Sequence, residues 1–153
     1  MGIEENKKTL QRYFDELMND GDYSKAGEIL HEDYVGSAGG GLKGIEGHKQ
    51  YRNYMFSAAP DGRFETLEMI AEGDKISIFQ EMNGTLDGEY QGIQGRGQPI
   101  TRLIASIYEF KDGKVIRGLT RVVIDNLSFY QQIGALPPTE EIIKAYNESH
   151  NLK

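Results

Sequence analysis

The histidines of this sequence do not form the pattern that a metal site requires, and the sequence has no cysteine that could act as a nucleophile. The three histidines, His31, His48 and His150, are dispersed, and none stands four residues from another as on a zinc-binding helix. The absence of cysteine excludes disulfides, thiolate zinc sites, iron–sulfur clusters and a cysteine nucleophile. We therefore expect no metal and no cofactor. We interpret His31 as the end of a helix and His48 as a solvated residue near the start of another.

The residues with the most chemical content lie at the end of a β-rich run. Alternation from Leu119 to Asp125 places Arg121 and Asp125 on the same face of a strand. An ion pair between them would keep the carboxylate ionised, which suits anion binding or a structural role. Alternatively, Asp125 caps a short helix that begins near Asn126, because Asp is a favoured N-cap residue.

Aromatic and basic side chains supply the candidates for a pocket wall. Arg102 and Tyr108 share one parity of a predicted strand, and an inward arginine would suggest a carboxylate or an ester carbonyl on the ligand. The opposite parity, which includes Leu103, is also apolar, so both facings stay open. Helical aromatic residues are expected to pack against the sheet, some of them at the cavity. The candidate pocket residues are Tyr13, Phe14, Tyr54, Arg102, Tyr108 and Arg121.

Three helices are expected to position these side chains from the N-terminal half. Apolar spacing predicts a helix from Lys7 to Met18, ended by Asn19-Asp20-Gly21. A short second helix would be capped by Asp22 and run to His31, and a third would span 47–58.

Strands dominate the segment that follows Pro60. Short glycine-bearing turns separate the runs, which indicates an antiparallel meander, and a brief strand at 34–35 precedes them. A tail helix capped by Thr139 ends the chain. Helices followed by strands predict an α+β fold, with the helices on one face of the sheet. The predicted strands are 64–70, 75–82, 100–110 and 115–125.

Length and charge limit the organisation and the partners. The 153 residues correspond to one domain, 1–153, with a helical C-terminal tail at 138–153. The formal net charge of −7 disfavours nucleic acid and anionic lipid as partners. The sequence has no apolar stretch of membrane-spanning length and no secretory leader, so a cytoplasmic location without membrane attachment is expected.

Eight short motifs, taken in order, resemble the SnoaL-like polyketide cyclase family. Each is weak alone, but their order and spacing from the first helix to Leu136 are moderately specific. The motifs are Asn19-Asp20-Gly21-Asp22, Gly44-Ile45-Glu46-Gly47, Pro60-Asp61, Ala71-Glu72-Gly73-Asp74, Gly84-Thr85, Gly92-Ile93, Asp112-Gly113-Lys114-Val115 and Gln131-Gln132-Ile133-Gly134-Ala135-Leu136.

This resemblance implies the cone of the nuclear-transport-factor-2-like superfamily, also described as a cystatin-like α+β fold. A curved antiparallel sheet would wrap around the N-terminal helices, with an apolar pocket between them and a homodimer or larger homo-oligomer as the assembly. Asp125 occupies the position of the family's acid/base aspartate, which catalyses aldol ring closure. The implied function is cofactor-free cyclisation or isomerisation of a mid-sized, largely apolar carbonyl compound.

Two other functions are compatible with the same fold. A non-catalytic small-molecule-binding protein is favoured by departures from the family, such as Gly84-Thr85-Leu86 where many members have Gly-Thr-His. An epoxide hydrolase of the limonene-epoxide-hydrolase type would need two acids beside an arginine in the cavity. Glu109 is the obvious sheet candidate for the second acid.

Overall fold

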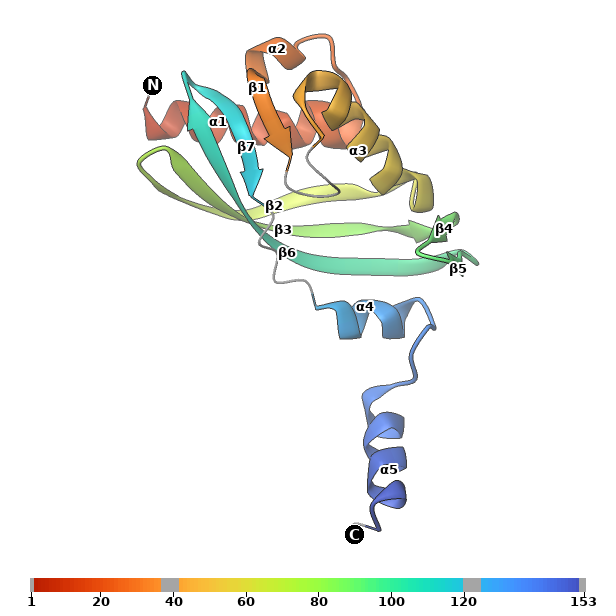
Figure 1. Cartoon of the computed structure of the whole chain (residues 1–153). Coiled ribbons are helices and arrows are strands. Elements are labelled where there is room, and N and C mark those ends of the chain that lie inside the picture. Colours follow the sequence, from red (N-terminus) through yellow and green to blue (C-terminus); the bar gives the residue numbers. More distant parts are fainter. Residues whose placement is uncertain (1, 37–41, 120–124, 152–153) are drawn as a thin grey trace.

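The computed structural model describes residues 2–36, 42–119 and 125–151, with its N-terminal helices on one side of a curved sheet (Figure 1). The first helix continues without a break from an α-helical half into a π-helical half, and Gly21, with φ +67°, ends it. The helices are α1 (Ile3–Arg12), η1 (Tyr13–Asp20), α2 (Ala26–Ile29), α3 (Gly44–Ala58), α4 (Asn126–Gln132) and α5 (Thr139–Ser149).

In the segments that the structure describes, five strands form the main sheet in the order β1-β7-β6-β3-β2, and β4 and β5 form a separate small hairpin. Neighbours from β2 to β7 are antiparallel, as the short turns predict, whereas β1 pairs with β7 in parallel. The predicted α+β class is confirmed. The strands are β1 (Leu30–Gly36), β2 (Arg63–Glu72), β3 (Lys75–Leu86), β4 (Glu89–Tyr90), β5 (Ile93–Gln94), β6 (Gln98–Lys111) and β7 (Lys114–Leu119).

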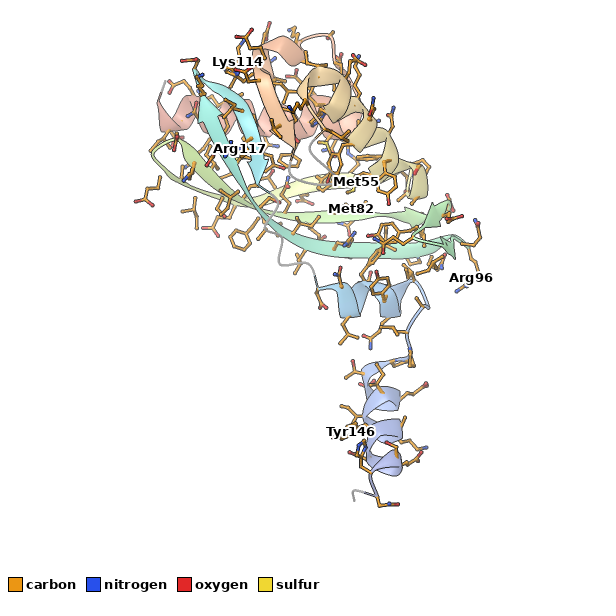
Figure 2. All side chains as sticks on the ribbon, viewed as in Figure 1. Met55, Met82, Arg96, Lys114, Arg117 and Tyr146 are labelled. Atoms are coloured by element: carbon orange, nitrogen blue, oxygen red, sulfur yellow. The ribbon has the colours of Figure 1, made fainter. Side chains whose placement is uncertain are left out.

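Strand register decides which side chains point toward the helices. Met82 pairs with Arg102, and Ile78 with Ser106, so these residues share the inner face with the buried Tyr108. The register therefore shows which face of the predicted strand points toward the helices. Arg102 and Tyr108 are on the inner face and Leu103 is on the outer one. Met55 of α3 and Met82 of β3 lie in the space between that helix and the sheet (Figure 2).

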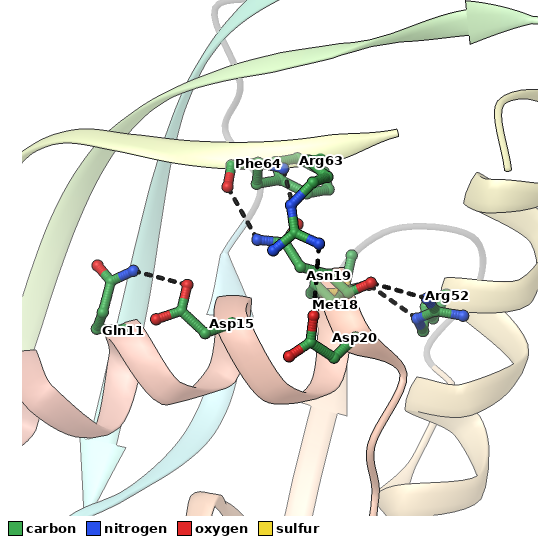
Figure 3. Close-up of polar contacts among 8 residues, drawn as sticks. All are labelled: Gln11, Asp15, Met18, Asn19, Asp20, Arg52, Arg63 and Phe64. Atoms are coloured by element: carbon green, nitrogen blue, oxygen red, sulfur yellow. Dashed lines mark hydrogen bonds and ion pairs between the residues drawn. The ribbon is translucent and has the colours of Figure 1, made fainter. Parts of the chain in front are cut away.

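Asn19 and Arg52 join the end of the first helix to its neighbours (Figure 3). The Asn19 amide donates to the Phe64 carbonyl at 2.9 Å and accepts from the Phe64 N–H at 2.8 Å, so it pairs with the edge strand as another strand would. Arg52 of α3 donates to the carbonyls of Met18 and Asn19 at 2.8 and 3.3 Å, satisfying groups that the helix end leaves unpaired. These contacts hold η1 and α3 over the sheet.

Two local expectations are wrong. The second helix spans only α2, and His31 lies in β1 because the chain is already extended at Leu30. Thr139 is the first residue of α5 rather than its cap, since Pro138 precedes the helix and no side chain caps it. Only the part of the predicted strand 115–125 that falls in β7 can be compared, because residues 120–124 lie outside the described segments.

The outer face of the sheet and helix α5 both expose apolar side chains. α5 extends away from the sheet, and Tyr146 lies far from it (Figures 1 and 2). None of its residues is buried. The exposed apolar residues of β2, β3 and β6 are Leu67, Ile70, Phe79 and Leu103, and those of α5 are Ile142, Ile143 and Tyr146.

Candidate functional site

A buried histidine surrounded by tyrosines lies between α3 and the inner face of the sheet. His48 is 1% exposed, and its ring contacts the edges of the Tyr13 and Tyr34 rings, with centroids 4.8 and 5.7 Å away. The Tyr13 and Tyr34 hydroxyls are 3.4 Å apart, and the Tyr108 ring lies 5.3 Å from that of Tyr13. We call this group, together with the partly buried Tyr51 of α3, the tyrosine seam.

Burial makes His48 a neutral imidazole. Its pKa is lowered from 6.5 to about 4, first by removal from water and then by the nearby Arg52 charge. The Tyr23 hydroxyl lies 2.7 Å from Nδ1, and Tyr23 stays protonated because burial raises its pKa. If the Tyr23 hydroxyl donates to Nδ1, the imidazole carries its proton on Nε2. Nε2 is buried and has no partner among the described residues.

The tyrosines of the seam are hydrogen-bond donors that cannot easily ionise. Burial is the largest cause that raises the pKa of Tyr13 and Tyr108 well above 10, and it raises that of Tyr34 to about 12. A protonated phenol in an apolar surrounding can donate to a carbonyl oxygen or to an enolate. The seam is therefore suited to stabilise negative charge that develops on oxygen.

Arg102 shares the inner face of β6 with Tyr108 and lies against two aromatic rings outside the seam. Its guanidinium carbon is 4.1 Å from the centre of the Phe129 ring and 6.0 Å from that of Tyr90. Burial raises the pKa of Tyr51, and the Arg102 charge lowers it. Arg102 also lines a pocket of about 170 Å³ between β6 and α4, whose other residues are Thr101, Leu103, Asp125, Ser128 and Gln132.

Asp125 caps helix α4. Its Oδ1 accepts from the Ser128 N–H at 2.9 Å, which confirms the capping interpretation, and the residue is exposed. Burial would make this carboxylate a stronger base, but Asp125 is not buried by the residues that the structure describes. Asp125 nevertheless lines the same pocket as Arg102, so two of the candidate residues come together there.

The remaining candidates divide into three groups. Tyr13, Phe14 and Tyr108 meet in the core, with ring centroids 5.0 to 5.8 Å apart. Tyr54 is 63% exposed on the outside of α3 and does not join them. Arg121 lies outside the described residues.

Sequence reasoning missed His48, which we expected to be solvated. Helical spacing places position 48 on the same stripe as Tyr51 and Met55, three and seven residues later, and this stripe faces the sheet. We predicted a solvated side chain because histidine is polar, although its position in the helix favours burial. Periodicity alone would have placed the imidazole inside.

The sheet acid named for the hydrolase alternative is on the wrong face. Glu109 pairs with Arg117 in the sheet register and contacts the charged groups of Lys75 and Arg117 at 3.7 and 3.3 Å. By parity it lies on the outer face, opposite Arg102. Glu109 therefore cannot supply a second acid beside Arg102.

The described residues contain neither a candidate metal cluster nor a helix that could span a membrane. No cluster of three or more His, Asp or Glu side chains there could hold a metal ion. No helix in those segments has the length and apolar character needed to cross a bilayer.

The chain belongs to the SnoaL-like polyketide cyclase family, which matches residues 8–133. This match confirms the resemblance seen in the eight motifs. Comparison with curated proteins gives no match.

Solved structures share the fold at low sequence identity. A protein of Jannaschia sp. CCS1 assigned to the SnoaL-like cyclases is 24% identical, with TM-score 0.75 over 88% of this chain and 94% of its own. TsrD from Streptomyces laurentii is 22% identical, with TM-score 0.77 over 89% and 99%. AclR from Streptomyces galilaeus, described as a hydroxylase, is 21% identical, with TM-score 0.76 over 98% and 95%. Relatives of this shape are thus described with different chemistries.

Proposed function

We propose that the chain catalyses proton transfer on a mid-sized, largely apolar carbonyl compound, as in an aldol-type cyclisation or an isomerisation. The observation that carries the proposal is the buried Nε2 of His48, which has no described partner and lies among protonated tyrosines. An unpaired buried donor costs free energy, and a ligand carbonyl would satisfy it. Membership of the cyclase family supports the same chemistry.

In the proposed reaction, a base removes the proton on the carbon next to the carbonyl, and the electron pair moves onto the carbonyl oxygen. His48 Nε2–H and the seam hydroxyls donate to the resulting enolate. The enolate carbon then attacks a second carbonyl, and the new alkoxide takes the proton from the base. Asp125, at the family's acid/base position, is the proposed base; its place in the pocket beside Arg102 supports this role.

Exchange of α-hydrogens tests the first step without knowledge of the natural substrate. In D2O the protein should speed the incorporation of deuterium into 2-tetralone. Proton NMR measures the rate of this exchange. Loss of one oxyanion donor in His48→Phe should slow exchange about 100-fold. Asp125→Asn should abolish it while keeping the helix cap, because Asn caps as well as Asp does. Exchange that survives in Asp125→Asn would remove Asp125 as the base.

The second candidate is a non-catalytic binding protein of the same fold. The exposure of Asp125 and its hydrogen bond to Ser128 favour it, because a capping residue needs no catalytic role. Binding of 2-tetralone without acceleration of exchange would select this candidate over the enzyme.

We also propose that the chain forms a homodimer, as the family resemblance implies. The exposed side chains of Ile70, Phe79 and Leu103 support this assembly, because they form an apolar surface on the outer face of the sheet. A second copy that covers this surface would lie on the opposite side of the sheet from the buried tyrosine seam.

A further inference from the structure

The inner face of the sheet carries two buried donors that the proposed proton transfer does not use. Gln80 of β3 is 1% exposed, and its Nε2 has no partner among the described residues. The Nε of Arg102 is likewise buried and has no partner there. Both residues are on the inner face, because Gln80 pairs with Ile104 and Met82 pairs with Arg102.

The register places these two donors close together. Gln80 and Arg102 are diagonal neighbours across the β3–β6 pair, a relation that long side chains can bridge. Both sit among apolar residues such as Ile78 and Met82. A guanidinium and a primary amide in such surroundings are matched to a planar group with two acceptor oxygens.

Among the described residues, no carboxylate forms an ion pair with Arg102. One terminal nitrogen of Arg102 donates to the Asn126 side-chain oxygen at 3.5 Å. Asp125 lines the same pocket, but its Oδ1 accepts from the Ser128 N–H. The Phe129 and Tyr90 rings hold the guanidinium in place without neutralising its charge. The guanidinium thus stacks on the Phe129 ring, and no carboxylate of the described residues neutralises it.

We propose that Arg102 and Gln80 form a subsite for a carboxylate on the ligand, so that the substrate is a carbonyl compound bearing an acid group. The inference rests on the proposed function in taking the seam as the binding site. The carboxylate would pair with Arg102, and the carbonyl to be enolised would lie toward His48.

Binding of a matched probe pair tests the subsite. The probes are 1-naphthoate and the uncharged 1-naphthamide, titrated into the 15N-labelled protein at neutral pH and low ionic strength. A charge-assisted pair predicts that naphthoate binds about tenfold more tightly. This ratio should fall to about one in Arg102→Met. Gln80→Met, which removes one donor and keeps the volume, should reduce it only in part.

Arg117→Met is the matched control. It removes one arginine from the outer face of the same sheet, where Arg117 pairs with Glu109, and should leave the ratio unchanged (Figure 2 labels Arg117). Circular dichroism and thermal unfolding identify variants that fail to fold, and Arg102→Lys then provides a milder test, for which a reduced ratio is expected. Equal affinity of the two probes for the wild type, binding of neither, or a ratio unchanged in Arg102→Met or Arg102→Lys overturns the proposal. Selectivity for naphthoate without exchange of 2-tetralone would overturn the proposed catalysis and leave the subsite standing.

Discussion

At the scale of single residues, the account depends on how His48 is held. Its ring is buried between α3 and the sheet, Tyr23 meets Nδ1 at 2.7 Å, and Nε2 is left without a described partner. A neutral imidazole in this position can polarise a carbonyl without carrying a charge into the core.

The contact between Tyr23 and His48 should contribute measurably to stability. Tyr23→Phe leaves the buried Nδ1 without a partner, which predicts a loss of about 1–3 kcal/mol in the free energy of unfolding. Urea denaturation measures this loss. Tyr54→Phe removes a hydroxyl from the same residue type at a 63% exposed position of α3 and should change little. Equal effects of the two substitutions would show that the 2.7 Å contact is not a stabilising bond.

The lowered pKa of His48 makes stability depend on pH. Because the folded-state pKa of about 4 lies below 6.5, the unfolded chain binds more protons between these values. Stability is then complete above about pH 6.5 and falls as the pH drops toward 4, by up to about 3 kcal/mol. Urea unfolding from pH 7.5 to 4.5 should show this fall, and the slope should be shallower in His48→Phe. Identical slopes for the two proteins would contradict the buried neutral state.

At the scale of elements, side-chain amides take the place of neighbouring strands. Asn19 pairs with both backbone groups of Phe64 on β2, and Gln132 of α4 pairs with both backbone groups of Thr101 on β6. These contacts attach a helix to each strand and occupy its free hydrogen-bonding groups. They set the position of η1, which carries Tyr13 into the seam.

Removal of one such amide should weaken the attachment of the helix to the strand. Asn19→Ala leaves a partly buried N–H and carbonyl of Phe64 unpaired, and we expect about 1–3 kcal/mol of lost stability in urea unfolding. Gln11→Ala is the control on the same helix, since its amide makes an exposed bond to Asp15 (Figure 3). If the stability lost in Asn19→Ala is no larger than that lost in Gln11→Ala, the Asn19 amide does not stabilise the attachment of the helix to β2.

The extent to which sequence predicted these elements follows from how local their causes are. Hydrophobic spacing and glycine turns located α1, α3 and the antiparallel strands, because each signal lies within the element. The facing of Arg102 and the parallel β1–β7 pair stayed open or were missed, since long-range pairing decides both. Asp125 showed the same limit, because its position before α4 allowed both a cap and a catalyst.

At the scale of the whole molecule, two apolar surfaces lie outside the core. The outer face of the sheet exposes Ile70, Phe79 and Leu103, and α5 buries none of its residues. An 11-residue helix is marginal in water without packing. Both observations favour the proposed homodimer, in which a second copy covers apolar surface that this chain leaves exposed.

The mass in solution tests the dimer. Light scattering after size exclusion should give twice 17.2 kDa for the wild type and about 17.2 kDa for the double variant Phe79→Glu/Leu103→Glu. Charges on the outer face would oppose burial but leave the monomer folded, because both positions are exposed. A monomeric wild type at micromolar concentration, or a variant that stays dimeric through the same face, would contradict the proposed assembly.

The imidazole nitrogens give the most direct test of the central claim, that a carbonyl ligand binds at His48. In 15N NMR spectra at neutral pH, 2-tetralone should shift the Nε2 signal of His48, because the ketone oxygen accepts a hydrogen bond from Nε2–H. His31 in β1 and His150 beyond α5 are internal controls that should not move. A His48 signal unchanged at saturating ligand, or a shift confined to His31 or His150, would place the binding site elsewhere and contradict the account.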